Sequence, residues 1–166
     1  MRTIFLDMDG VVADFDTFAS NLLGRPIGWH QSKFDLTKEE WEKLGAVDRL
    51  YYQLPLMPDA TKLVAYAKSL SSRFKVQFLT AVPRRSTMPE ARADKQAWVD
   101  KYFPGMRMDI GPFSHDKQKW CIPGDILIDD RPSNIEEWKA VGGIAIYHTG
   151  DVDATIKQIN KVISYE

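Results

Sequence analysis

Residues 3–12 read Thr-Ile-Phe-Leu-Asp-Met-Asp-Gly-Val-Val, and the organisation of the remaining chain follows from them. The run 3–6 predicts a short buried strand that ends at Asp7 and Asp9. In open parallel sheets, functional residues gather at the carboxyl ends of the strands. Neighbouring carboxylates repel each other unless a cation compensates them, and ligands that are all oxygen suit Mg2+. The stretch therefore indicates a magnesium site, although acidic residues also simply end strands and cap helices.

The composition is that of an ordinary globular protein. The chain has 166 residues, of which 44% are hydrophobic and 27% are charged, enough for one α/β domain or one core with an insertion. A net charge of -1 gives no reason to expect binding to a nucleic acid polymer or a membrane. Cys121 is the single cysteine, and neither a signal peptide nor a membrane-spanning run is visible. We therefore expect a cytoplasmic protein.

Strand-like and helical patterns alternate along most of the chain. After the first strand, four further runs predict strands, at residues 75–80, 108–110, 125–130 and 144–147. Helical apolar stripes and capping signals lie between them. This alternation predicts an α/β fold with a doubly wound parallel sheet of about five strands.

Residues 14–72 do not follow the alternation. Within them, residues 24–58 are rich in aromatic residues and poor in strand-like runs. We expect a small helical cap, inserted after the first strand, over residues 14–72, and a core domain over residues 1–13 and 73–166. The alternative is a long crossover that only covers the sheet, with its aromatic residues serving as core.

Polar side chains follow three of the expected strands and would meet at one edge of the sheet: Asp7 and Asp9, Thr80, and Asp129 and Asp130. Lys119, ten residues before Asp129, would return to the same edge, and Lys117 is its rival. Carboxylates can hold a divalent cation and one of them can attack, while a hydroxyl, an ammonium and backbone amides can hold anionic oxygens. The set indicates phosphoryl transfer.

Four segments, in chain order, resemble the four motifs of the haloacid dehalogenase (HAD) superfamily of phosphatases: residues 7–12, Thr80, Lys119 and residues 128–130. Within that superfamily, residues 7–15 and 127–132 are similar to the 5'(3')-deoxyribonucleotidases. The resemblance implies a Rossmann-like HAD core. It also implies a Mg2+-dependent phosphomonoesterase that acts on nucleoside monophosphates, with deoxyribonucleotides favoured, through an aspartyl-phosphate.

The resemblance also implies roles for the acidic residues. Asp7 would be the nucleophile and a Mg2+ ligand. Asp9 would be the general acid and base, and its main-chain carbonyl would bind Mg2+. Asp130 would complete the metal shell, with Asp129 bonded to the motif lysine or to the metal's waters, or acting as the ligand in its place.

The other implied roles concern the substrate. Thr80, the Ala81 amide and Lys119 would bind the phosphate, and Phe15 would stack on the base. Ala81 stands where family members often have serine, which removes a hydroxyl but keeps the amide. Trp29 and Trp41 are further candidates for the base pocket.

Three alternatives stay open at this point. The first is a HAD phosphatase for another small ester, such as a sugar phosphate. The second is a receiver-type signalling module, which would not need the insertion of about sixty residues after the first strand. The third is a catalytically silent binding protein, against which the full set of site residues argues. A homodimer is compatible with the sequence.

Overall fold

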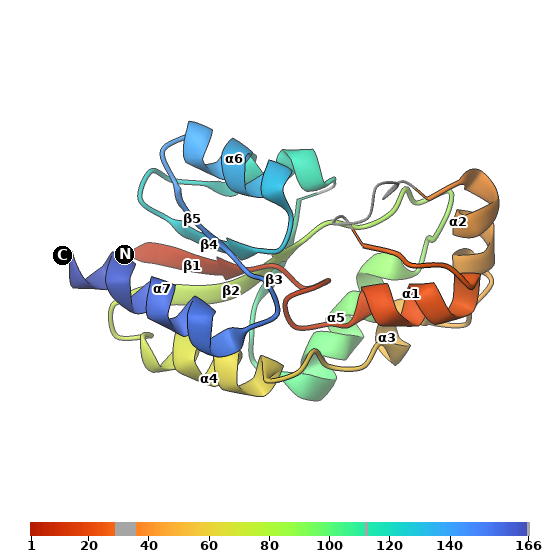
Figure 1. Ribbon diagram of the computed structural model, residues 1–166, viewed down its shortest axis with the longest axis horizontal. Helices are drawn as coiled ribbons and strands as arrows, with labels where there is room; N and C mark the ends of the chain where they lie inside the picture. The colour runs from red at the N-terminus through yellow and green to blue at the C-terminus, as the bar shows by residue number, and fades with distance from the viewer. Residues whose placement is uncertain (29–35, 112, 166) are drawn as a thin grey trace.

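The computed structural model describes residues 1–28, 36–111 and 113–165. Its centre is a five-stranded sheet in the order β3-β2-β1-β4-β5, in which every paired strand is parallel. The strands are β1 (Arg2–Leu6), β2 (Phe74–Thr80), β3 (Met108–Ile110), β4 (Ile126–Asp129) and β5 (Ile144–Tyr147). The predicted doubly wound α/β fold is confirmed (Figure 1).

Helices lie on both sides of this sheet. Two of them, α4 (Ala60–Ser69) and α7 (Val152–Ser164), lie together on one side, and α6 (Pro132–Ala140) lies on the other (Figure 1). The 3-10 helix η1 (Ser114–Trp120) packs against α6. With both faces covered, the central strands β1 and β4 are buried on both sides, as is typical of parallel sheets.

The remaining helices extend past the carboxyl ends of the strands (Figure 1). They are α1 (Phe15–Leu23), α2 (Lys38–Gly45) and α3 (Leu50–Gln53), and α3 packs against α5 (Ala91–Tyr102). A capping box begins α2, because Thr37 accepts from the Glu40 amide and Glu40 accepts from the Thr37 amide.

The segment 14–72 is not uniform in its packing. Its last helix, α4, lies on α7, where Lys62 Nζ is 2.6 Å from Asp153 Oδ1 and the Tyr66 hydroxyl bonds to Asn160. The division into a cap over residues 14–72 and a core over residues 1–13 and 73–166 stays a prediction. These contacts place α4 with the helices that flank the sheet, whereas α1 to α3 project beyond it.

One continuous cluster of buried apolar side chains joins the sheet to the projecting helices. It contains Ile4 and Leu6 of β1 together with Ala19 of α1 and Leu44 of α2. Trp98 of α5 is completely buried in it, and its indole N–H donates to the Leu54 carbonyl at 2.8 Å. The opposite face of the sheet has a smaller cluster, made of Phe5, Leu79, Leu127 and Trp138.

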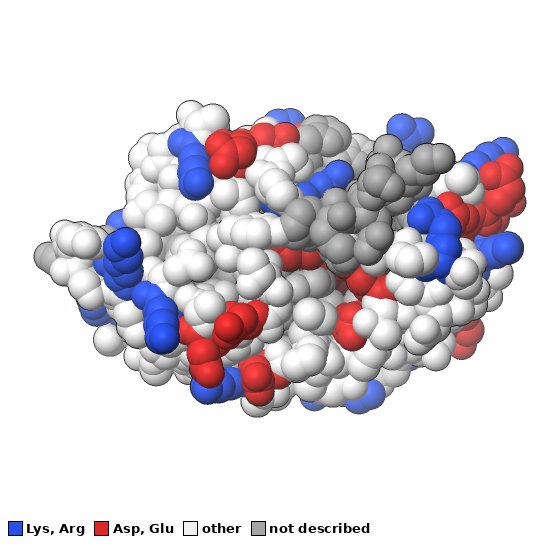
Figure 2. All heavy atoms as spheres, in the orientation of Figure 1, with Lys and Arg blue, Asp and Glu red and all other residues white. Residues whose placement is uncertain are grey.

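The surface carries both signs of charge. On the face in Figure 2, lysine and arginine side chains alternate with aspartate and glutamate. Within the described part of the chain, no helix combines the length and the apolar character needed to cross a membrane.

Candidate active site

A tight turn after β1 brings the first two carboxylates to the sheet edge. The amides of residues 11–13 all donate to the Met8 carbonyl, at 2.9 to 3.1 Å. Gly10 has φ +83, and a Cβ atom at this position would lie 1.9 Å from Asp130 Oδ2. Only glycine therefore allows Asp130 to lie against this turn.

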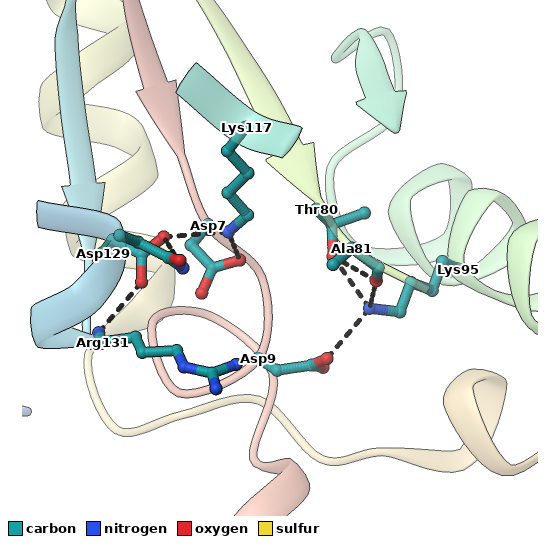
Figure 3. Close-up of polar contacts among 9 residues, drawn as sticks. Asp7, Asp9, Thr80, Ala81, Lys95, Lys117, Asp129 and Arg131 are labelled. Atoms are coloured by element: carbon teal, nitrogen blue, oxygen red, sulfur yellow. Dashed lines mark hydrogen bonds and ion pairs between the residues drawn. The ribbon is translucent and has the colours of Figure 1, made fainter. Parts of the chain in front are cut away.

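Lys117 joins the ends of β1 and β4. Its Nζ lies 2.6 Å from Asp7 Oδ1 and 2.8 Å from Asp129 Oδ2, and all three side chains are buried (Figure 3). Asp129 also accepts from the Arg131 amide at 2.9 Å and from Asn134 Nδ2 at 3.0 Å. Burial lowers the pKa of the Lys117 ammonium, but the carboxylates of Asp129 and Asp7 outweigh burial and leave that pKa raised. Lys117 is therefore a fixed positive charge at neutral pH.

The prediction that Lys119, and not Lys117, lies beside the strand-end carboxylates was wrong. The Lys119 side chain is 72% exposed and pairs with Asp116 at 2.6 Å, away from the strand-end carboxylates. Spacing to Asp129 could not decide between the two, since it ignores which way each side chain points. On a 3-10 helix, residues two apart lie on different sides. Lys117 faces the sheet, and its backbone packs against Gly111.

Three carboxylates form a cluster beside Lys117. Asp7, Asp129 and Asp130 each offer an oxygen, and these oxygens lie within 4.8 Å of one another. Burial, with repulsion from Asp7 and Asp129, raises the pKa of Asp130 well above its ordinary value. One ammonium cannot balance three carboxylates, and a cation that accepts only oxygen ligands would remove the repulsion. The residues therefore fit Mg2+.

Asp9 has a different partner from Asp7. Its Oδ2 accepts from Lys95 Nζ at 2.9 Å, and Lys95 also donates to Thr80 Oγ1 at 2.8 Å and to the Ala81 carbonyl at 2.7 Å (Figure 3). Lys95 was not among the residues predicted for the site. A signal was present: Ala91, Lys95, Trp98 and Val99 fall on one face of α5, and a lysine within such a stripe is unusual.

A cavity of about 610 Å³ opens in front of these carboxylates. Its polar lining includes Asp7, Asp9, Asp130 and Lys117, together with Ala81. Thr80 lies behind this wall, 1% exposed, and is connected to it through Lys95. Of the predicted phosphate ligands, Ala81 thus borders the cavity directly, and Thr80 does not belong to its described lining.

The other side of the cavity is apolar and aromatic. Phe15 lines it and stacks on Tyr51, with ring centroids 6.0 Å apart and planes 14° from parallel. Trp41 also lines the cavity, whereas Trp29 lies outside the described residues. Burial, and secondarily the Asp9 charge, raise the pKa of Tyr51, so its ring stays neutral. The cavity therefore combines charged side chains with aromatic side chains that fit a flat, uncharged group.

The parallel sheet with its strand-end carboxylates is that of a HAD-type hydrolase acting on phosphomonoesters. Residues 1–165 match the model of the family described as "5' nucleotidase, deoxy (Pyrimidine), cytosolic type C protein", and the chain belongs to this family. The resemblance to HAD phosphatases and the assignment as an enzyme are confirmed.

A solved structure, a hydrolase from Streptococcus pneumoniae TIGR4, is similar over 98% of each chain, with 14% sequence identity and a TM-score of 0.47. No similar sequence is found among curated proteins.

Proposed function

We propose that this protein is a Mg2+-dependent phosphomonoesterase for nucleoside monophosphates, with deoxyribonucleotides favoured, and that it works through an aspartyl-phosphate. One observation carries the proposal. Asp7 and Asp130, which cluster with Asp129 beside Lys117, line the same cavity as the stacked rings of Phe15 and Tyr51. A nucleotide combines the same two kinds of group, a charged phosphate and a flat base.

The metal site in this proposal consists of the side chains of Asp7 and Asp130 and the main-chain carbonyl of Asp9. Mg2+, when bound there, supplies positive charge beside the phosphate oxygens. Asp129 holds Lys117 and the Arg131 amide, which favours a supporting role over direct ligation, although its position in the cluster also allows ligation.

The first chemical step is displacement at phosphorus by Asp7. A carboxylate oxygen of Asp7 forms a bond to phosphorus, and the bond from phosphorus to the ester oxygen breaks. The electron pair stays on the leaving oxygen, which takes a proton from Asp9. The nucleoside leaves as an alcohol, and Asp7 carries the phosphoryl group.

The second step returns the enzyme to its starting state. Asp9, now a carboxylate, takes a proton from a water molecule whose oxygen attacks phosphorus. The bond from phosphorus to Asp7 breaks, inorganic phosphate leaves and Asp9 is protonated again. Lys117 and the Ala81 amide stabilise the phosphoryl oxygens in both steps, and the Thr80 hydroxyl is held beside them through Lys95.

The preference for deoxyribonucleotides and a cytosolic location rest on the family's description, which names both. The base lies against Phe15, which the cavity lining and the stacked Tyr51 support. Trp41 borders the same space and is a second candidate contact.

The test is phosphate release in Mg2+ from a panel of deoxyribonucleoside monophosphates, ribonucleoside monophosphates and sugar phosphates. Asp7→Asn protein measures the background release of phosphate. Addition of EDTA, followed by excess Mg2+, tests whether turnover depends on the metal. We expect the fastest turnover with deoxyribonucleotides and none with EDTA. Faster turnover of a sugar phosphate would keep the mechanism but reject the nucleotide assignment. Turnover that survives EDTA would reject the metal site.

A further inference from the structure

Lys95 is one of the least exposed charged side chains in the described structure, at 1% exposure. An ammonium has three N–H donors, and Lys95 has three acceptors, Asp9 Oδ2, Thr80 Oγ1 and the Ala81 carbonyl, at 2.7 to 2.9 Å. Its Nζ also lies 4.6 Å from the centre of the Tyr51 ring. Every direction in which this ammonium can donate is thus occupied, and two of the three acceptors, on Asp9 and Ala81, belong to residues that line the cavity.

These contacts constrain Asp9 in one particular way. Lys95 holds Oδ2, whereas Asp9 Oδ1 is buried and has no hydrogen-bond partner among the described residues. One oxygen of the carboxyl group is therefore fixed by Lys95, and the other is left without a hydrogen bond among the described residues. Because Lys95 also holds Thr80 and Ala81 at the end of β2, it fixes the carboxylate relative to the place where the phosphate would bind.

We propose that Lys95 is the positioning residue for Asp9: it fixes Oδ2 and so sets the orientation of the carboxyl group that protonates the leaving oxygen and then activates water. This inference rests on the proposed function, since it concerns the same reaction. Small errors in the placement of a catalytic group cost large factors in rate, so a residue that sets this placement is as necessary as the acid itself.

A purely structural role is the alternative, and the position of Lys95 argues against it. A buried ion pair gives little net stability compared with well-packed apolar residues of similar volume, so stability alone does not explain a lysine at this position. Methionine would fill the same stripe on α5 beside Trp98. What methionine cannot do is hold the carboxylate, the hydroxyl and the carbonyl in one arrangement.

The experiment compares wild-type protein with Lys95→Met on two substrates. In a deoxyribonucleoside monophosphate, the leaving alkoxide needs a proton. In p-nitrophenyl phosphate, the leaving phenolate departs without one. A misplaced acid therefore slows the first step only for the nucleotide, and slows attack by water for both. Rapid-mixing measurements separate the two steps, since the first p-nitrophenolate appears as a burst.

For Lys95→Met we expect kcat on the nucleotide to fall by about 100-fold or more, which is the range for loss of general acid–base catalysis. KM should change little. The burst of p-nitrophenolate should persist at close to one equivalent, followed by slow turnover. Lys95→Gln, whose amide can still donate to Asp9 or Thr80, should recover part of kcat.

Lys101→Met is the matched control. Lys101 is an exposed lysine on the same helix, 4.9 Å from the centre of the Tyr102 ring and outside the described cavity lining. We expect it to keep the wild-type kcat on both substrates.

The outcomes separate this inference from the function on which it rests. A wild-type protein that releases no phosphate from any ester rejects the proposed function. With an active wild type, the inference is overturned if Lys95→Met keeps its kcat on the nucleotide, or if its burst amplitude and turnover fall by the same factor. Failure of both Lys95 variants to fold, with Lys101→Met folded, would assign Lys95 to the core and also overturn it.

Discussion

Two buried lysines serve the two carboxylates of the first strand end, and their surroundings differ. Lys117, from η1, contacts two carboxylates and belongs with the strand ends. Lys95, from α5, contacts one carboxylate and two neutral oxygens, and touches a ring of the projecting helices. The first arrangement compensates charge, as a metal and phosphate site needs. The second orients a single group, as an acid and base needs. Asp7 and Asp9 are only two residues apart, yet they are held from opposite sides.

The largest expected effect comes from replacing Asp7, the carboxylate that contacts Lys117 at the end of β1. In Asp7→Asn, the amide is too poor a nucleophile, and we expect kcat to fall by about 10,000-fold or more. Phosphate release on the nucleotide panel measures it, and circular dichroism checks that the fold is kept. A folded variant with more than a tenth of the wild-type turnover would remove Asp7 from the role of nucleophile.

Lys117→Met and Lys119→Met form a matched pair that tests the corrected assignment. Removing the Lys117 ammonium leaves Asp7 and Asp129 without their counter-charge, and we expect about 3 to 5 kcal/mol lower stability in denaturant unfolding. Turnover should fall by about 100- to 1,000-fold, as when one group that stabilises developing charge is lost. Lys119→Met should resemble wild type in both measurements, because its side chain is largely exposed. The reverse pattern would restore Lys119 to the site.

Asp130→Asn should act on the cation more than on the chemistry. Loss of one carboxylate from the cluster should weaken Mg2+ binding about 10- to 100-fold. Titration calorimetry and the Mg2+ concentration for half-maximal turnover both measure this affinity. Asp153→Asn, in an exposed pair with Lys62, is the control. Unchanged Mg2+ affinity in Asp130→Asn would mean that Asp129, and not Asp130, contacts the metal directly.

The smallest expected effect lies at the apolar end of the cavity. Phe15→Leu removes an aromatic face worth about 1 kcal/mol, so KM for nucleotides should rise about fivefold with kcat nearly unchanged. Phe18→Leu, on the same helix but outside the described cavity lining, should leave KM alone. Equal shifts in both variants would mean that α1 is only perturbed and that Phe15 does not touch the base.

The sequence predicted those features that depend on local pattern. Buried apolar runs and the carboxylates that follow them can be read directly from the sequence. The sheet and the clustering of Asp7, Asp129 and Asp130 could therefore be expected. The orientation of Lys117 could not, because it depends on how η1 packs against the sheet. Lys95 was missed for a related reason. Its importance comes from Asp9, 86 residues away, and no short motif surrounds it.

The shared apolar core has a consequence for how this molecule unfolds. Because Trp98 and the buried side chains of α1 and α2 belong to the same cluster as β1, the described residues of the projecting helices form no separate interior that could survive alone. Melting of the sheet and loss of the substrate-facing wall should occur in a single cooperative transition. Excising the helical segment would then remove part of the interior on which the sheet depends, and the shortened chain should be open to proteolysis along its whole length.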